Sequence, residues 1–193
     1  GTEIGKTLIS AIFTQALQAD YWKPIQSGNP EEADALFIKK MTQLPNLKVW
    51  DSSYVLSQPL SPHTAAEIDG VTIDLEKIPL PQTHNSLIVE LAGGILVPIN
   101  DHQTNLDLIK KLDLPVLLVS KNYLGSINHT LLTYQILKDH HVPIIGIVFN
   151  GPSNPSGEKF ILKYTQLPVV LRVQQEMEIT PEIIHHYAKS ISK

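Results

Sequence analysis

Three short apolar runs divide the middle of the chain, at residues 86–90, 116–120 and 144–150. They are mostly β-branched residues and leucine with little apolar-polar alternation, which is typical of strands covered on both faces. Between them, residues 106–112 and 127–138 carry apolar side chains at every third or fourth position, as amphipathic helices do. This order predicts β-α-β crossovers, and hence a three-layer α/β fold with a mostly parallel sheet flanked by helices.

Two further segments have a pattern of their own. Residues 57–81 are rich in proline and polar side chains, which predicts a loop with short irregular pieces over the sheet edge. The tail at residues 181–191 has its apolar side chains on one face, which favours a helix packed on the sheet over one that binds a membrane.

Composition narrows the class of protein. The chain has 193 residues, 42% of them hydrophobic, which is enough for one core, so we expect a single domain over residues 1–193. A net charge of -4 argues against a nucleic-acid partner. The absence of cysteine excludes disulfides, thiolate catalysis and cysteine-ligated zinc. No apolar run is long enough to span a membrane, so a cytoplasmic protein without a membrane partner is the default expectation.

Residues 1–7 read Gly-Thr-Glu-Ile-Gly-Lys-Thr, and an apolar pattern at helical spacing follows at residues 8–17. Gly5 lets backbone N–H groups approach phosphate oxygens, Lys6 offers an ammonium to the β- and γ-phosphates, and Thr7 offers a hydroxyl to Mg²⁺. The start of a helix also favours anions. These residues predict a nucleotide site on a P-loop NTPase-like fold, against the alternative of an ordinary surface turn.

This loop departs from the usual motif. Only Thr2, Glu3 and Ile4 separate Gly1 from Gly5, one residue fewer than usual, and no β-strand precedes Gly1. We therefore expect either a variant loop or a chain that starts part-way into the motif, with its first strand absent.

Ligands of open α/β sheets collect beyond the carboxyl ends of the strands, and reactive side chains lie at those positions here. Lys23 follows Tyr21-Trp22, and a second lysine near Lys6 suits a concentrated anion. Thr7, Asp34 and Glu90 provide the hydroxyl and carboxylates that commonly hold Mg²⁺ in phosphoryl transfer. Taken singly, Lys23 and Asp34 are equally typical of solvated surface charges, and Gly93-Gly94 of a plain turn.

A second anion site is predicted where residues 123–129 lead into a helix, with Ser126 or Asn128 able to cap it. A capped helix without a ligand is the simpler alternative. The adjacent pairs His140-His141 and His185-His186 point to different helix faces and favour surface imidazoles over a metal site. His63 is compatible with either a substrate contact or a turn-stabilising role.

Several motifs together resemble the dethiobiotin synthetase family in order and spacing over nearly the whole chain. They are the loop at residues 2–7, Lys-Pro-Ile-Gln-Ser-Gly at 23–28, Ser-Pro-His at 61–63, residues 90–101 with Ala-Gly-Gly and Val-Pro-Ile-Asn-Asp, Gly-Ser-Ile-Asn-His at 125–129, and Asn150.

The resemblance implies a homodimeric ligase of biotin biosynthesis that depends on ATP and Mg²⁺. Such an enzyme carboxylates 7,8-diaminopelargonic acid with CO2 and closes a ring, giving dethiobiotin, ADP and phosphate. It implies Lys23 and Lys6 as catalytic residues and Thr7, Asp34 and Glu90 as Mg²⁺ ligands. It implies Ser27 at the diamine, and Gly125, Ser126 and Asn128 at the substrate carboxylate across the dimer interface. Around the nucleotide it places Glu3, Ile4, Gly5, Lys6, Thr7, Leu8, Asp34, Glu90, Leu91, Ala92, Gly93 and, at the adenine edge, Asn150.

Two further departures concern this site. Leu91 stands where relatives commonly carry glycine, and its Cβ restricts the backbone near the phosphates. Residues 171–176 lack the glycine and proline that relatives often place beside the base. A partitioning-type ATPase that uses ATP as a binding switch is the rival hypothesis, although the tail is not strongly basic. A second alternative is an inactive relative of the family.

Overall fold

The computed structural model describes residues 3–29 and 34–191, so residues 1–2, 30–33 and 192–193 lie outside the described residues. No helix within these ranges has the length and apolar character needed to cross a membrane. The strands are β1 Asp20–Trp22, β2 Ile25–Ser27, β3 Val49–Trp50, β4 Tyr54–Leu56, β5 Leu87–Val89, β6 Val116–Lys121, β7 Ile144–Asn150 and β8 Val169–Val173. The helices are α1 Lys6–Leu17, α2 Asp34–Thr42, α3 Pro62–Ile68, α4 Asn105–Leu112, α5 Ser126–Asp139, α6 Pro155–Thr165 and α7 Pro181–Lys189, with a 3-10 turn at Leu75–Lys77.

All strand pairs in the three sheets are parallel. One sheet has the order β3-β1-β5, another has the order β6-β7-β8, and β2 pairs with β4. The predicted strands at residues 86–90, 116–120 and 144–150 correspond to β5, β6 and β7, and the predicted helices between them to α4 and α5. The predicted α/β fold with a parallel sheet flanked by helices is thereby confirmed.

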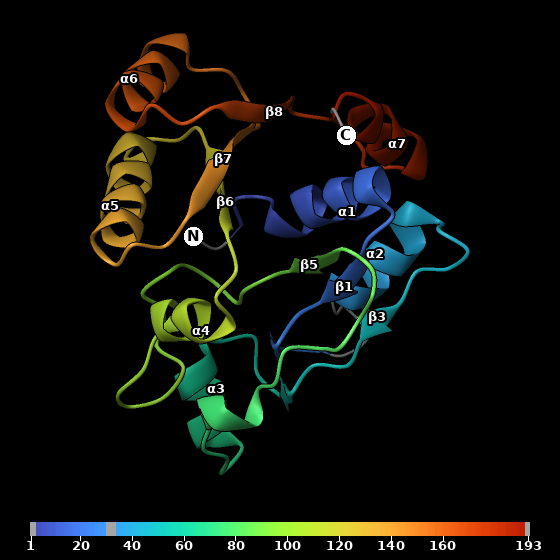
Figure 1. Cartoon of the computed structure of the whole chain (residues 1–193), viewed down its shortest axis with the longest axis vertical. Helices are drawn as coiled ribbons and strands as arrows, with labels where there is room; N and C mark the ends of the chain where they lie inside the picture. Colours follow the sequence, from blue (N-terminus) through green and yellow to red (C-terminus); the bar gives the residue numbers. More distant parts are fainter. Residues whose placement is uncertain (1–2, 30–33, 192–193) are drawn as a thin grey trace.

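Helices cover the sheets from two sides (Figure 1). Next to β6, β7 and β8, α5 and α6 lie on one side, whereas α1 and α7 lie on the other. The first core cluster joins α1, α2 and α7 to β1 and β8, with Ile12, Tyr21 and Ile184 fully buried. A second cluster joins α5 and α6 to the opposite face of β6 and β7, around Leu137 and Ile147. Hydrogen bonds join the phosphate loop and the start of α1 to Lys121, Asn150 and Glu90, so the loop lies at the carboxyl ends of β5, β6 and β7.

Local signals set where several helices begin. A capping box of Thr104 and Asp107 starts α4, and the Thr180 side chain accepts the backbone N–H of Ile183 at the start of α7. Helix α7 packs against α1 and α2, and its Ile184 is buried in the same core cluster as Leu171 and Val173 of β8. The prediction that the tail helix packs on the sheet is thereby confirmed.

The expectation of a loop with short irregular pieces at residues 57–81 is wrong for residues 62–68, which form the helix α3. Pro62 occupies the first turn, where its missing N–H costs nothing, and Ala65 and Ala66 are buried in a third cluster around Trp22 and Ile78. Tertiary burial of two small side chains therefore stabilises a helix that a proline-rich sequence obscured.

Candidate phosphate-binding and metal-binding site

The phosphate loop is fixed to the end of β7 by one close contact. Gly5 is the N-cap of α1 with φ 88°, in the left-handed region that favours glycine. A Cβ at this position would lie 2.1 Å from Asn150 Nδ2. The same nitrogen donates a hydrogen bond of 2.9 Å to the Ile4 carbonyl, and Lys121 Nζ donates to the Glu3 carbonyl at 3.2 Å. The loop thus depends on glycine for both its conformation and its packing.

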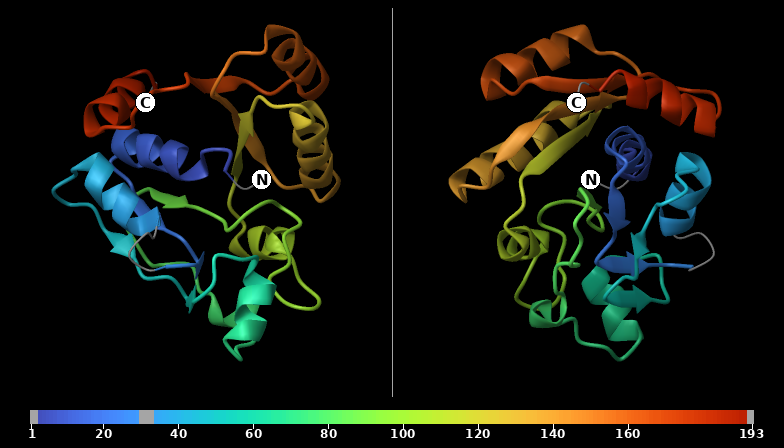
Figure 2. Two further views of the ribbon diagram at one scale, coloured as in Figure 1. Left: turned by 180° about the vertical axis from the view of Figure 1, so that it is seen from behind. Right: turned by 45° about the vertical axis from the view of Figure 1, so that its right-hand side comes forward.

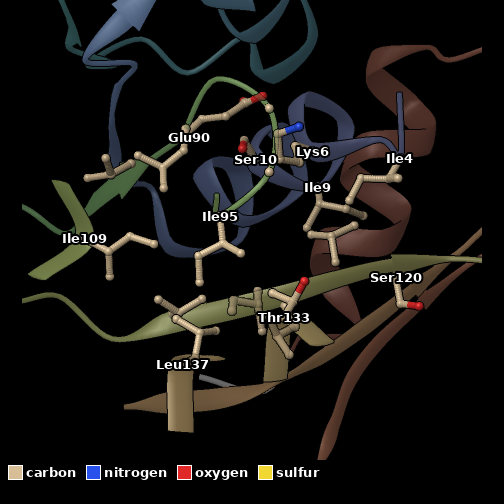
Figure 3. A pocket seen from close by; sticks show the side chains of 18 of the residues that line it. Ile4, Lys6, Ile9, Ser10, Glu90, Ile95, Ile109, Ser120, Thr133 and Leu137 are labelled. Atoms are coloured by element: carbon tan, nitrogen blue, oxygen red, sulfur yellow. The ribbon is translucent and has the colours of Figure 1, made fainter. Parts of the chain in front are cut away.

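Lys6 begins α1 and lies close to the charged groups of the neighbouring strand ends. Burial lowers the pKa of the Lys6 ammonium, the carboxylates of Glu90 and Asp34 oppose this, and the ammonium of Lys23 adds to it. The two lysines therefore act on one shared region, as expected for a site that takes a concentrated anion. Figure 3 shows Lys6, Ser10 and Glu90 grouped together.

Three oxygen-bearing side chains from three elements converge beside Lys6. The Thr7 hydroxyl oxygen lies 2.5 Å from Asp34 Oδ1 and 2.8 Å from Glu90 Oε1. A hydroxyl has one proton to donate, so one of these two contacts brings lone pairs together and favours a proton or a cation between them. Asp34 also forms an ion pair with the Lys23 ammonium, whose side chain is 12% exposed.

Glu90 is the buried member of this group. It is 4% exposed, and the Tyr21 hydroxyl donates to its Oε2 at 2.9 Å. Burial raises the pKa of the Glu90 carboxyl and the negative charge of Asp34 raises it further, against the opposing influence of Lys23 and of hydrogen bonds from Thr7 and Ser10. Burial and the Glu90 charge hold the pKa of Tyr21 well above its usual range, so the phenol remains a donor.

This donor set fits Mg²⁺. One hydroxyl and two carboxylates are hard oxygen ligands, and a divalent cation among them would offset the repulsion that raises the Glu90 pKa. The described residues include no cluster of three or more His, Cys, Asp or Glu side chains that could hold a metal ion, so Mg²⁺ here would have two carboxylates and one hydroxyl as side-chain ligands. An arrangement of few protein ligands is the usual one for Mg²⁺, which keeps water and phosphate oxygens in its other positions.

The loop after Glu90 accommodates leucine without strain. Leu91 is not among the described residues with a left-handed φ, and its side chain packs against two of the core clusters. Gly93 does have φ 79°, and a Cβ there would lie 2.8 Å from Val97 Cγ2. The fully buried Asn105 amide donates to the carbonyls of Ala92 at 2.7 Å and Gly94 at 2.8 Å. The backbone at Leu91 is therefore one that leucine can adopt, and the leucine side chain gains packing contacts there.

Tyr21, Asn105 and Lys121 were missed by sequence reasoning. Tyr21 immediately precedes the strand-end Trp22-Lys23 pair, which marks its strand but gives no sign of a partner 69 residues away. Asn105 lies at the start of an amphipathic helix, where a polar residue is expected for a local reason. No signal in the sequence distinguishes these three from other polar residues.

The predicted substrate residues lie in two places. Ser27 ends β2, and Ser126 begins α5; the hydroxyl oxygens of both are buried without a hydrogen-bond partner among the residues that the structure describes. A buried hydroxyl without a partner is costly, so each is suited to a ligand's polar group. Gly125, next to Ser126, lines a hollow of about 470 Å³ together with residues 152–154. Asn128 is exposed on α5.

The expected side-chain cap of α5 is wrong. The N-cap is Gly125, with φ 101° and no side-chain capping hydrogen bond. The Ser126 N–H instead donates to the Tyr123 carbonyl at 3.0 Å, which forms the turn through the backbone. A glycine with a positive φ turns the chain here, so neither Ser126 nor Asn128 is needed as a cap.

Other predicted residues have structural partners. The Leu8 side chain packs against the first core cluster, so any role at the nucleotide falls to its backbone. The predicted surface positions of the paired histidines are confirmed, since all four are exposed. His63 lies within hydrogen-bond distance of Ser61 and Thr64 through its two ring nitrogens, which favours the turn-stabilising role. In the segment of residues 171–176, Arg172 pairs with the buried Glu158 carboxylate.

Comparisons with known proteins show which family the chain is similar to. A family described as an AAA domain matches residues 1–183. The ATP-dependent dethiobiotin synthetase BioD of Cytophaga hutchinsonii is 51% identical over 97% of this chain and 91% of its own length. The protein of the same name from Christiangramia forsetii is 44% identical over 100% of this chain and 93% of its own length. A ParA family ATPase from Chlorobium tepidum TLS matches in structure with a TM-score of 0.55 at 16% identity, covering 97% of this chain and 93% of its own, which indicates a shared fold.

Proposed function

Because the chain belongs to the dethiobiotin synthetase family, we propose that it joins CO2 to 7,8-diaminopelargonic acid and closes the cyclic urea of dethiobiotin at the expense of ATP. The observation that carries this proposal is the convergence of Lys6, Thr7, Lys23, Asp34 and Glu90 at one end of the parallel strands. This group offers positive charge and metal-binding oxygens beside a phosphate loop.

The reaction has three steps. One amine of the substrate adds to CO2 and loses a proton, which gives a carbamate. A carbamate oxygen then attacks the γ-phosphorus of ATP, and ADP leaves. The second amine attacks the carbamate carbon, phosphate departs, and the loss of a proton leaves the cyclic urea. Each step places or moves negative charge on oxygen, so stabilisation of anions and positioning of the two amines are the main demands.

The two lysines would provide the stabilisation of anions. Lys6, at the start of α1, would contact the β- and γ-phosphates, and Lys23, which follows β1 and pairs with Asp34, would act on the same region. Both ammonium groups would neutralise charge on the phosphoryl group as it passes to the carbamate. Because Lys23 is held by Asp34, its ammonium is fixed before the substrate arrives.

Thr7, Asp34 and Glu90 would hold Mg²⁺, which when bound neutralises phosphate charge and orients the β- and γ-oxygens. The Tyr21 hydroxyl orients the Glu90 carboxylate from its far oxygen. Backbone N–H groups of Glu3 to Leu8 and of the loop from Leu91 to Gly93 would surround the phosphates. Asn150, whose amide nitrogen supports Ile4, would meet the adenine edge through its remaining atoms.

The diamine substrate would lie against Ser27, with its carboxylate at Gly125, Ser126 and Asn128. The unpartnered hydroxyls of Ser27 and Ser126 support these positions. In a homodimer, the turn at Gly125 would act on the substrate of the partner subunit. We also infer a single catalytic domain over residues 1–193 that works in the cytoplasm.

The rival hypothesis of a nucleotide-switched partitioning protein rests on fold alone. The ParA family neighbour shares 16% identity, whereas the relatives named dethiobiotin synthetase reach 51%. Lys23 held beside the metal-binding oxygens also has an evident use in a ligase and none in a switch.

The test is phosphate release measured with ATP alone and with ATP, diamine and bicarbonate together, alongside detection of dethiobiotin. Release that requires the diamine and matches dethiobiotin one to one supports the ligase. Hydrolysis of ATP at the same rate with and without the diamine would identify a switch. No release of phosphate in either mixture would identify an inactive relative.

A further inference from the structure

Glu158 of α6 is a buried carboxylate with no role in the reaction described above. It is 3% exposed, and a glutamate rarely lies so deep unless charged or hydrogen-bonding partners surround it. Its Oε1 accepts from Asn122 Nδ2 at 2.7 Å and from the Asn154 backbone N–H at 3.1 Å, and its Oε2 pairs with the Arg172 guanidinium. Burial alone would raise the pKa of this carboxyl, but these hydrogen bonds hold the pKa below its usual value, so Glu158 is ionised at neutral pH.

The three partners of Glu158 come from the carboxyl ends of three neighbouring strands. Asn122 directly follows β6, Asn154 belongs to the segment after β7, and Arg172 is the penultimate residue of β8. The strands are parallel and adjacent in the order β6-β7-β8, so their carboxyl ends meet at one edge, where ligands of an open α/β sheet collect (Figure 1). One buried side chain therefore joins the segments that leave this edge.

Asn122 extends the connection to both segments around the hollow beside Gly125. Besides Glu158, its amide nitrogen donates to the Pro152 carbonyl at 2.8 Å. The lining of the hollow consists of residues 122–125, 127 and 152–154. Asn122 thus bonds to the second of these segments while belonging to the first, and Glu158 bonds to both. The spacing between the two segments depends on these two side chains.

The turn assigned to the substrate carboxylate needs such support. Residues 123–125 are all exposed. Two hydrogen bonds close the turn on itself, from the Ser126 N–H to the Tyr123 carbonyl at 3.0 Å and between the Tyr123 hydroxyl and His129 Nδ1 at 2.6 Å. Contacts within a turn fix its shape and leave its position to the residues on either side. Helix α5 follows the turn, and Asn122 stands immediately before it.

Arg172 also has a purpose that follows from charge. A buried anion at this edge would repel the carboxylate of a substrate, because charges inside a protein are screened less than in water. The Arg172 guanidinium compensates the charge of Glu158, and its central carbon lies 4.9 Å from the centre of the Phe149 ring. The pair therefore presents no net charge to an anion bound at the neighbouring turn.

We propose that the ionised Glu158, with Asn122 and Arg172, forms a charge-neutral anchor that positions the turn at residues 123–126 for the carboxylate end of the substrate. This inference rests on the proposed function, which assigns the substrate carboxylate to that turn. The three are positioning residues, because the proposed reaction places none of them against the substrate, the nucleotide or the metal. The anchor acts on binding of the diamine and leaves the phosphate loop unaltered.

Steady-state formation of dethiobiotin, with diamine and ATP varied separately, tests the hydrogen bonds of the anchor. Glu158→Ala leaves the Asn122 amide and the Asn154 N–H without their acceptor, so the KM for the diamine should rise about tenfold or more while the KM for ATP stays within about twofold. Glu158→Gln keeps an acceptor oxygen and should hold the KM for the diamine within about twofold of the unmodified value. Lys159→Ala, at an exposed neighbour on α6, is the matched control and should change neither KM.

Hydrogen exchange provides a readout that needs neither ATP nor diamine. Amides at residues 122–127 and 152–154 should exchange about tenfold faster or more in Glu158→Ala and at unmodified rates in Glu158→Gln. Asn122→Ala removes the link to the turn and leaves the pair of Glu158 and Arg172 intact. It should raise the KM for the diamine about threefold or more and provides the same test if Glu158→Ala does not fold.

A double variant tests the charge. Arg172→Met leaves the Glu158 carboxylate uncompensated and should raise the KM for the diamine about fivefold. Addition of Glu158→Gln removes that charge and should reverse most of the increase, as expected for repulsion of an anionic substrate. An increase that the double variant retains would come from lost packing on Phe149, and would overturn the charge-neutral anchor.

The outcomes separate the anchor from the reaction. Absence of dethiobiotin with the unmodified protein would overturn the proposed function, and the anchor with it. Normal turnover by the unmodified protein, with an unchanged KM for the diamine in Glu158→Ala and Asn122→Ala, would overturn the anchor alone. An equal rise in the KM values for diamine and ATP would also overturn it, because the damage would then extend to the whole site.

Discussion

Substitution of Gly5 by alanine tests how far the phosphate loop depends on its contact with β7. The backbone at Gly5 has φ 88°, which costs an L-residue about 1–2 kcal/mol. The new Cβ would also lie 2.1 Å from Asn150 Nδ2, so the amide must move and lose its hydrogen bond to the Ile4 carbonyl. Loss of that bond adds about 1–2 kcal/mol. We expect Gly5→Ala to lower the free energy of unfolding by about 2–4 kcal/mol in total.

Gly70 provides the matched control. It has φ 66° and no atom within 4 Å of the position that a Cβ would take, so Gly70→Ala reports the backbone cost alone. The double variant Gly5→Ala with Asn150→Ala removes the clash and retains the backbone cost. Urea unfolding is measured for the unmodified protein, Gly5→Ala, Gly70→Ala, Asn150→Ala and the double variant, and it should show a larger loss for Gly5→Ala than for Gly70→Ala. The coupling between residues 5 and 150 should also be favourable to the double variant.

The ligand-binding counterpart is a titration with ATP and Mg²⁺. Displacement of Asn150 shifts Ile4 and the N–H groups of the loop, so we expect affinity to fall about tenfold or more in Gly5→Ala and to be unchanged in Gly70→Ala. A stability loss in Gly5→Ala no greater than that in Gly70→Ala would refute the reasoning, since the contact with Asn150 would then carry no energy.

Three further predictions address the rest of the site. Lys23→Ala should reduce dethiobiotin formation by about 100-fold or more with an unchanged circular dichroism spectrum, and near-normal turnover would remove this lysine from the mechanism. Leu91→Gly should lower the free energy of unfolding by about 1–3 kcal/mol, because the leucine side chain packs against two core clusters; a gain in activity without loss of stability would show that leucine only hinders the loop. The folded-state pKa of Glu90 is raised, so the stability this carboxyl contributes without metal is present below its unfolded pKa near 4.5 and is lost as pH rises through the raised value. Glu90→Gln should flatten that decline in urea unfolding measured against pH, whereas an unaltered pH profile would contradict the raised pKa.

Contiguous patterns in the sequence determined the fold class and the phosphate loop. The apolar runs at β5, β6 and β7 and the Gly5-Lys6-Thr7 motif are local features, and each depends on residues within a few positions of one another. The helix α3 lacks such a local signal, because its stability comes from burial of Ala65 and Ala66 against residues distant in the sequence.

Only the tertiary structure decided which side chains meet. Asp34 follows Thr7 by 27 positions and Glu90 follows it by 83 positions. A carboxylate oxygen of each nevertheless lies within 2.8 Å of the Thr7 hydroxyl oxygen. The hydrogen bonds from Tyr21 to Glu90 and from Asn150 to Ile4 likewise depend on the order and register of strands. Sequence patterns report the environment of a residue along its own element, whereas the pairing of elements arises from packing over the whole chain. The partners of the site residues were therefore visible only in three dimensions.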